Sequence, residues 1–165
     1  MNILAVLVAA LVPMAVGMLW YNTKVFGAAW MKETGLSEEK LRANSMVKVF
    51  SVSLLFSFML AFVLQSCVIH QLGITASFFD YREQIKDATT PEGALYKSVM
   101  DLVGTGHRTF GHGMLHGVIT AIFLALPVLG ISALFEAKSF KYIFIHAGFW
   151  VVTLGIMGGI LSVWM

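Results

Sequence analysis

The stretch TFGHGMLHGVITAIFLALP, residues 109–127, combines two histidines with the start of a long apolar run. The hydrocarbon core of a bilayer is about 30 Å thick, so a helix that crosses it needs roughly 20 apolar residues. The run continues to about residue 135. The sequence therefore predicts a membrane-spanning helix over residues 111–135, with His112 and His116 on one face near its beginning.

Three further runs of this kind occupy residues 3–21, 46–72 and 142–164. Backbone amides find no water in lipid, and these runs are too long and too uniformly apolar for barrel strands, so helices are expected. The first run lacks a basic beginning and ends in Trp20-Tyr21, which favours a retained span over a cleaved signal peptide. The predicted fold is all-α, a four-helix transmembrane bundle that forms one integral membrane domain over residues 1–165.

The composition agrees with this class. Of the 165 residues, 58% are hydrophobic and 12% are charged, whereas soluble domains have about 45–50% and about 25%. A net charge of +2 without a basic, aromatic-rich run excludes nucleic acid as an expected partner. The lipid bilayer is the expected surrounding, and the single cysteine, Cys67, excludes an internal disulfide.

Basic residues predict the orientation. The connections after the first and third spans carry seven of them, and the middle connection carries four: Lys24, Lys32, Lys40, Arg42, Lys48, Lys138 and Lys141 against Arg82, Lys86, Lys97 and Arg108. Because basic residues accumulate on the cytoplasmic side, the first and last connections are predicted inside and both termini outside.

Two connections contain helix signals. Ser37 is a predicted N-cap of a helix that runs on into the second span. Thr90 and Pro91 predict the start of an amphipathic helix in the middle connection. Its apolar stripe consists of Leu95, Val99, Leu102 and Val103. We expect this helix to lie on the outer surface or to fold back over the mouth of the bundle.

His112 and His116 are also candidate metal ligands, because borderline metals such as zinc accept two imidazoles at this spacing. His70 and His107 are predicted on the same side of the membrane and could complete the set, with Asp101 and Cys67 as further candidates. The pattern matches no closed ligand motif. A transition metal is therefore the candidate cofactor, while haem is disfavoured, with His70 and His112 as the only pairing to consider.

A structural role competes with the metal site and is the favoured interpretation. Gly113 and Gly117 flank His116, and Gly155 and Gly159 repeat the spacing in the fourth run. Small residues let helices approach closely, and polar side chains then form hydrogen bonds across the contact. Gln65 is the buried polar residue that most needs such partners, since its amide has donor and acceptor ends.

No catalytic residue is predicted. The sequence contains no phosphate-binding glycine loop, nucleophile elbow or intramembrane carboxylate pair. An acid/base enzyme within the membrane is therefore not expected.

Three segments resemble the domain of unknown function 1761 family of small bacterial membrane proteins. The opening LAVLVAALVPMAVGMLWYNTKVFGAAWMKETGL has the family's pattern of an apolar helix with a proline followed by aromatic residues. FGHGMLHG with ALPVLGISALFE resembles its third helix, and FKYIFIHAGFWVVTLGIMGG resembles its last. The resemblance implies four spans in a bacterial plasma membrane and no assigned activity. It singles out, besides the histidines, Trp20, Tyr21, Phe26, Gly27 and Trp30.

Two functions remain open at this point. The glycine pairs favour a protein that acts through association, as a homo-oligomer or as an accessory subunit of a membrane complex. The alternative is a small transporter, or a metal- or proton-binding membrane protein, that uses His112 and His116.

Overall fold

Each apolar run forms a long helix in the computed structural model, which describes residues 2–164 apart from the side chain of residue 42. The candidate membrane spans are α1 (Ile3–Trp20), α4 (Met46–Val68), the continuous segment 110–135, and α9 (Phe140–Val163). The described residues contain no strand. The predicted all-α fold with four apolar helices is thereby confirmed.

The third span is a composite. It consists of α7 (Phe110–Thr120), a π-helical turn η4 (Ala121–Ala125) and α8 (Leu126–Phe135). Pro127 lacks a backbone N–H, so the regular hydrogen-bond ladder cannot continue unchanged across it. The N–H of Leu126 bonds instead to the carbonyl of Ala121, five residues back. The proline is thus accommodated by a wider turn within the third span.

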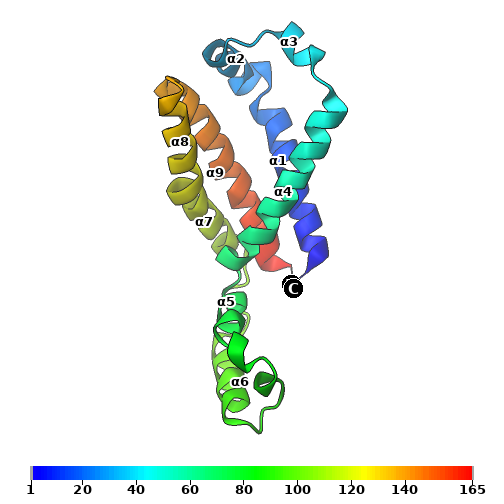
Figure 1. Ribbon diagram of the computed structural model, residues 1–165, viewed down its shortest axis with the longest axis vertical. Coiled ribbons are helices and arrows are strands. Elements are labelled where there is room, and N and C mark those ends of the chain that lie inside the picture. Colours follow the sequence, from blue (N-terminus) through cyan, green and yellow to red (C-terminus); the bar gives the residue numbers. More distant parts are fainter. Residues whose placement is uncertain (1, 165) are drawn as a thin grey trace.

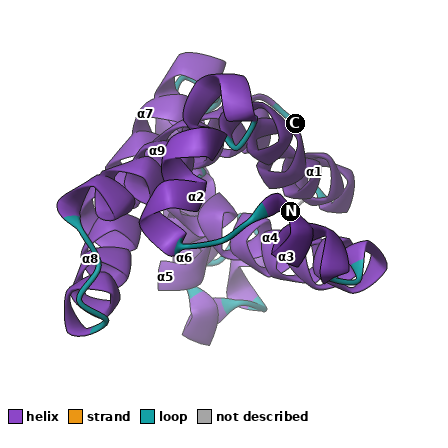
Figure 2. Ribbon diagram, turned by 90° about the horizontal axis from the view of Figure 1, so that it is seen from above, coloured by secondary structure: helices purple, strands orange, loops and turns teal. Residues whose placement is uncertain are grey.

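The fourth span is the centre of the bundle. α9 contacts α1, α4, α7 and α8. In its apolar stretch of 18 residues, 56% is buried inside the structure, whereas 11% is buried in the corresponding stretch of the third span. The core joins the first half of α1, the second half of α4 and the second half of α9 around Val6, Leu64 and Met157. Toward their other ends α4 and α8 diverge, as both ribbon views show (Figures 1 and 2). The dense packing is therefore confined to one half of the bundle.

Glycines make the closest helix contact. A side chain at Gly113 would overlap the backbone of Gly158, and one at Gly117 would overlap the carbonyl of Leu154. Gly155 lies against Val118 and Met114, and Gly159 lies against the ring of Phe110. The two spaced glycine pairs of the sequence therefore meet within one chain, between α7 and α9, with Gly158 as an additional member.

The shorter elements lie in the connections. They are η1 (Thr23–Gly27), α2 (Ala28–Thr34), α3 (Glu38–Ala43), α5 (His70–Ser77), η2 (Phe79–Tyr81), η3 (Gln84–Lys86) and α6 (Pro91–Val103). Thr90 caps α6 as predicted, its hydroxyl accepting the N–H of Gly93 at 3.0 Å.

Two predictions about these elements are wrong. α3 does not run on into the second span, because Asn44 is extended and Ser45 begins α4 as a new N-cap. The second span ends at Val68 rather than at residue 72, since Ile69 is extended and α5 starts at His70. Of the two placements expected for α6, folding back over the mouth of the bundle is not the one observed.

Instead, α5 and α6 form an arm that projects beyond the bundle along its long axis (Figure 1). The hydroxyl groups of Thr75 and Tyr96 join the two helices at 2.9 Å. The predicted apolar stripe of α6 is not covered at Leu102, whose surface is 87% exposed. Pairing with α5 thus replaces the expected contact of α6 with the bundle mouth.

The glycine contact generates a test. Gly117→Ala places a methyl group against the backbone of α9, so we expect a destabilisation of about 1–3 kcal/mol. Gly130→Ala in α8 is the control, because its new methyl group would lie 3.9 Å from the nearest Ile143 atom and should gain helix propensity. Thermal unfolding in detergent should show a lower Tm for the first variant only. Equal Tm values for both variants would contradict the close contact.

Candidate metal centre

The break between α4 and α5 positions His70. Ile69 is extended, although its N–H still bonds to the carbonyl of Gln65. His70 follows as the first residue of α5 and lies beside the start of α7. A continuous helix would have carried its side chain along the α4 axis, so the change of direction at Ile69 brings it to the third span.

The N-cap of α7 positions the other two histidines. The hydroxyl of Thr109 accepts the N–H of His112 at 3.2 Å, which satisfies one of the free donors at a helix start. His116 follows one turn later on the same face. The glycine contact with α9 holds this part of α7 in place.

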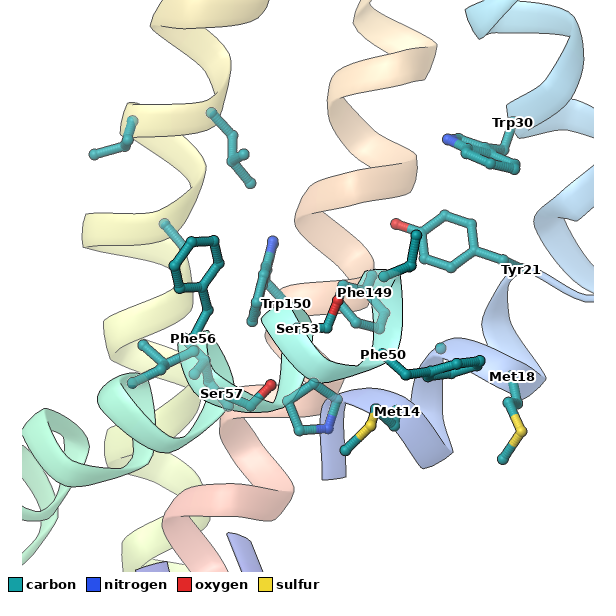
Figure 3. A pocket seen from close by; sticks show the side chains of 18 of the residues that line it. Met14, Met18, Tyr21, Trp30, Phe50, Ser53, Phe56, Ser57, Phe149 and Trp150 are labelled. Carbon is teal, nitrogen blue, oxygen red and sulfur yellow. The ribbon is translucent and has the colours of Figure 1, made fainter. Parts of the chain in front are cut away.

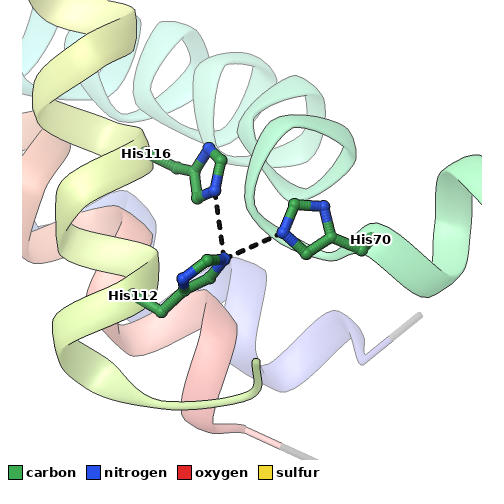
Figure 4. A group of neighbouring side chains, drawn as sticks. All are labelled: His70, His112 and His116. Carbon is green, nitrogen blue, oxygen red and sulfur yellow. Dashed lines mark hydrogen bonds between the residues drawn. The ribbon is translucent and has the colours of Figure 1, made fainter. Parts of the chain in front are cut away.

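Three imidazoles converge there (Figure 4). The Nε2 atom of His112 lies 2.8 Å from that of His70 and 3.0 Å from that of His116. One ligand atom from each of these residues lies within 4.8 Å of the other two. We call His70, His112 and His116 the histidine cluster.

His107 lies at the edge of this cluster. Its ring centroid is 5.5 Å from that of His70 and 5.0 Å from that of His112. His107 belongs to the turn before α7. It therefore does not follow the helical spacing that would direct it away from the face of His112 on one continuous helix. The structure thus gathers all four histidines named as ligand candidates, three of them with converging nitrogen atoms.

The other candidates lie elsewhere. Asp101 forms an ion pair with Lys97, with 2.5 Å between Nζ and Oδ2. Cys67 is an exposed residue of α4. Neither belongs to the group of converging ligands found among the described residues.

Hydrogen bonding alone leaves the histidine cluster incompletely satisfied. An imidazole nitrogen carries either one hydrogen or one lone pair, yet Nε2 of His112 has two nitrogen neighbours at hydrogen-bond distance. Partial burial and the imidazoles of His116 and His107 lower the pKa of His70 below its ordinary value. The neutral form, which can bind a metal, is therefore favoured at this residue.

An aromatic cluster marks the opposite end of the bundle. Trp20 donates its indole N–H to the carbonyl of Ile145 at 3.1 Å, and its ring contacts Phe26. The hydroxyl of Tyr21 pairs with Nδ1 of His146 at 2.9 Å. A side chain at Gly27 would overlap the Tyr21 carbonyl.

The residues highlighted by the family resemblance thus attach the turn after α1 to α9. Trp30 completes the cluster by contacting Tyr21 edge-on, with 5.2 Å between their ring centroids. Burial and the nearby Tyr142 raise the pKa of Tyr21, so its hydroxyl stays protonated. The partnership with His146 could not be predicted from the sequence, because no local pattern connects residues 125 positions apart.

Next to this cluster lies a cavity of about 920 Å³, which we call the lateral groove. It lies between α1, α4, α8 and α9, and Ser53, Phe56, Tyr21, Trp30 and Trp150 are among its lining residues (Figure 3). Most of the lining is apolar. The groove occupies the space left where α4 and α8 diverge, and no local sequence pattern predicts it.

Gln65 lies at the opposite, densely packed end. It is 1% exposed, and its amide nitrogen has no hydrogen-bond partner within residues 2–164. The sequence predicts that this buried amide needs partners at both ends, and its nitrogen end has none among the described residues.

Comparison with known proteins identifies a family without an assigned function. The family model described as "Protein of unknown function (DUF1761)" matches residues 4–162. No curated protein matches the chain, and no solved structure matches it.

Proposed function

The chain belongs to the DUF1761 family of proteins of unknown function, and from this premise we propose that it is a multi-pass membrane protein that binds one transition-metal ion through His70, His112 and His116. The observation that carries the proposal is the contact of one His112 nitrogen with two other imidazole nitrogens. A cation between the three rings would accept all three lone pairs at once, which no arrangement of ring protons can achieve.

The distances suit such an ion. Zinc–imidazole bonds are about 2.0–2.1 Å long, so ligand nitrogens in a tetrahedral site lie about 3.3 Å apart. The two short Nε2 separations, 2.8 and 3.0 Å, need to open by only a few tenths of an ångström. Three histidines leave a fourth position for water or a ligand, the arrangement of sites that exchange or activate what they bind.

Binding is better supported than conduction through the four helices. The histidine cluster lies at one end of the bundle, and the lateral groove lies toward the other. In the densely packed half of the bundle, Leu64 and Met157 are 1% exposed or less. Close packing leaves little space for an ion or water to pass, so a transport path through one chain is not part of the proposal.

Zinc binding tests the proposal. Purified protein equilibrated with zinc should retain one ion per chain, measured by elemental analysis and calorimetry. His112→Ala should weaken binding by more than the roughly 10–100-fold typical of losing an outer partner. His146→Gln is the matched control, because His146 is the one histidine outside the gathered four and should leave zinc binding unchanged.

Circular dichroism of each variant separates a lost ligand from a lost fold. Zinc retention by folded His112→Ala at the wild-type affinity would eliminate the metal proposal. In that case a stability change alone would favour the structural interpretation, in which the histidines only hold α5 and α7 together.

Association with a second copy is a second candidate function. The glycine pairs no longer support it, since they are used between α7 and α9 of one chain. What supports it is the lateral groove of about 920 Å³ with its mainly apolar lining. α4 flanks the groove, and only 17% of its apolar stretch of 18 residues is buried inside the structure. A spanning helix of a second copy would cover this surface by van der Waals packing.

Energy transfer between labelled copies in liposomes tests this association. Ser53→Trp fills the groove and should raise the dissociation constant at least about tenfold, the effect of roughly 1.4 kcal/mol. Val47→Trp on the same helix is the control, since Val47 is 78% exposed and is absent from the groove lining. The association proposal would be wrong if the protein stayed monomeric at all densities in the liposome. It would also be wrong if both variants changed the dissociation constant equally.

The proposed orientation places both termini and the α5–α6 arm outside the plasma membrane, in keeping with the distribution of basic residues. In a Cys67→Ser background, a cysteine at Ala88 should react with an impermeant maleimide on intact cells. A cysteine at Glu39 should react only after permeabilisation. Both positions are exposed in the folded chain, so the reverse labelling pattern would invert the orientation.

A further inference from the structure

A second cavity, of about 830 Å³, lies at the end of the bundle that carries the termini. We call it the terminal cavity. It is lined by the ends of α1, α4 and α9, by the start of α5, by the last turn of α6 and by the α6–α7 turn, with Asn2, Gln65, Gln71, Gly104, Arg108 and Trp164 among its residues. Ile69 and Gln71, on either side of His70, line the cavity, but no residue of the histidine cluster does.

Arg108 supplies a cation to this cavity. Its Nε and Nη2 atoms donate to the carbonyls of Ser162 and Trp164, each at 2.6 Å. Since a guanidinium has five N–H groups, three remain without an acceptor among the described residues. No described carboxylate lies within 4.0 Å of Arg108. The cation therefore has hydrogen-bond donors to spare and no counter-charge from residues 2–164.

Two glutamines add unmet hydrogen-bonding groups to the same cavity. Gln65 is 1% exposed, and its Nε2 donor has no partner in the described chain. The last torsion of a glutamine is broad, so this amide can turn toward the cavity without leaving its rotamer. Gln71 donates to the carbonyl of Gly104 at 2.5 Å, which fixes its orientation and leaves its buried Oε1 acceptor without a described partner.

These groups define the chemistry of a ligand. Arg108 and Gln65 offer donors and positive charge, which suit the oxygen atoms of an anion. Gln71 offers an acceptor, which suits a hydroxyl or ammonium group on the same ligand. An unpaired buried polar group costs free energy, and burial lowers the pKa of Arg108 by disfavouring its charged form. A ligand that bonds to Arg108, Gln65 and Gln71 at once would offset the free-energy cost of leaving these groups without partners.

The cavity also lies at the depth of lipid headgroups in the proposed membrane orientation. Arg108 precedes the third candidate span by two residues, and Trp164 follows the fourth directly. We propose that the terminal cavity binds a phosphate group that carries a hydrogen-bond donor, as in the phosphoethanolamine headgroup of a lipid or in a free phosphate ester. Arg108 and Gln65 hold the phosphate, and Gln71 accepts from the donor.

Matched ligands test the proposal and distinguish its two sources. Protein in nanodiscs of phosphatidylethanolamine or phosphatidylcholine is transferred to detergent, and native mass spectrometry counts the lipids retained. The two headgroups share the phosphate, but choline has no N–H donor. We expect one retained phosphatidylethanolamine per chain and no saturable retention of phosphatidylcholine. In parallel, phosphoethanolamine and phosphocholine are titrated in detergent while Tm is followed.

A saturable Tm increase with phosphoethanolamine alone supports a free ester as the ligand, whereas retention of phosphatidylethanolamine without that increase supports a lipid. Equal behaviour of the ethanolamine and choline compounds overturns the proposal. An absence of saturable binding in both experiments also overturns it, and indicates that only water fills the cavity.

Gln65→Met is the variant that separates binding from folding. It replaces an unpartnered amide by an apolar side chain of similar size, so the ligand-free protein should have the same or a higher Tm. Its affinity for the ethanolamine ligand should fall by about tenfold. Gln84→Met, on the exposed side of the arm, should change neither quantity. Unchanged affinity in folded Gln65→Met overturns the proposed site.

Arg108→Lys gives a second readout, since Lys keeps the charge but loses the planar donor fork. Because Arg108 also bonds to the end of α9, a lower Tm is expected along with weaker binding. Zinc binding by the Gln65→Met and Arg108→Lys variants should be unchanged. Failure of the phosphate site can therefore be recognised independently of the metal proposal.

Discussion

The backbone contact between α7 and α9 is the constraint on which the rest of the structure depends. Gly113 and Gly117 bring the third span so close to Gly158 and Leu154 that no side chain fits between them. In lipid, apolar side chains gain little by leaving one apolar surrounding for another, so such van der Waals contact is a main source of helix association. The contact holds the first two turns of α7 against the best-buried helix of the bundle.

This contact explains why the two ends of the bundle differ. Where α7 lies against α9, the neighbouring halves of α1 and α4 close over Val6, Leu64 and Met157. Beyond the π-helical turn at Ala121–Ala125, the third span continues as α8 and diverges from α4. Dense packing at one end and the lateral groove at the other are thus two consequences of one asymmetric arrangement.

Polar groups are distributed according to the same asymmetry. The histidine cluster and the terminal cavity both lie at the densely packed end, where helix ends and turns bring ionisable side chains together. At the other end Tyr21 pairs with His146 within the aromatic cluster beside the lateral groove. In the proposed membrane-spanning arrangement, ionisable groups are costly unless they find partners. His146 has a partner on Nδ1 and none on its buried Nε2 among the described residues. The histidine cluster and Gln65 also leave hydrogen-bonding capacity, which the proposed ligands would use.

The sequence by itself determined the four apolar helices, the start of α6 at Thr90 and Pro91, and the shared face of His112 and His116, because length, capping and helical periodicity are local properties. Counting spans also assigned His70 and His107 to the same end. Only the tertiary structure decided the break at Ile69, the use of the glycines within one chain, the pairing of Tyr21 with His146, and the position of Arg108 at the end of α9. The physical reason is that helices in lipid are apolar on nearly every side, so periodicity cannot mark which face meets which neighbour. That choice depends on backbone approach and polar partners far apart in the chain, and it decides which histidines and amides share a site.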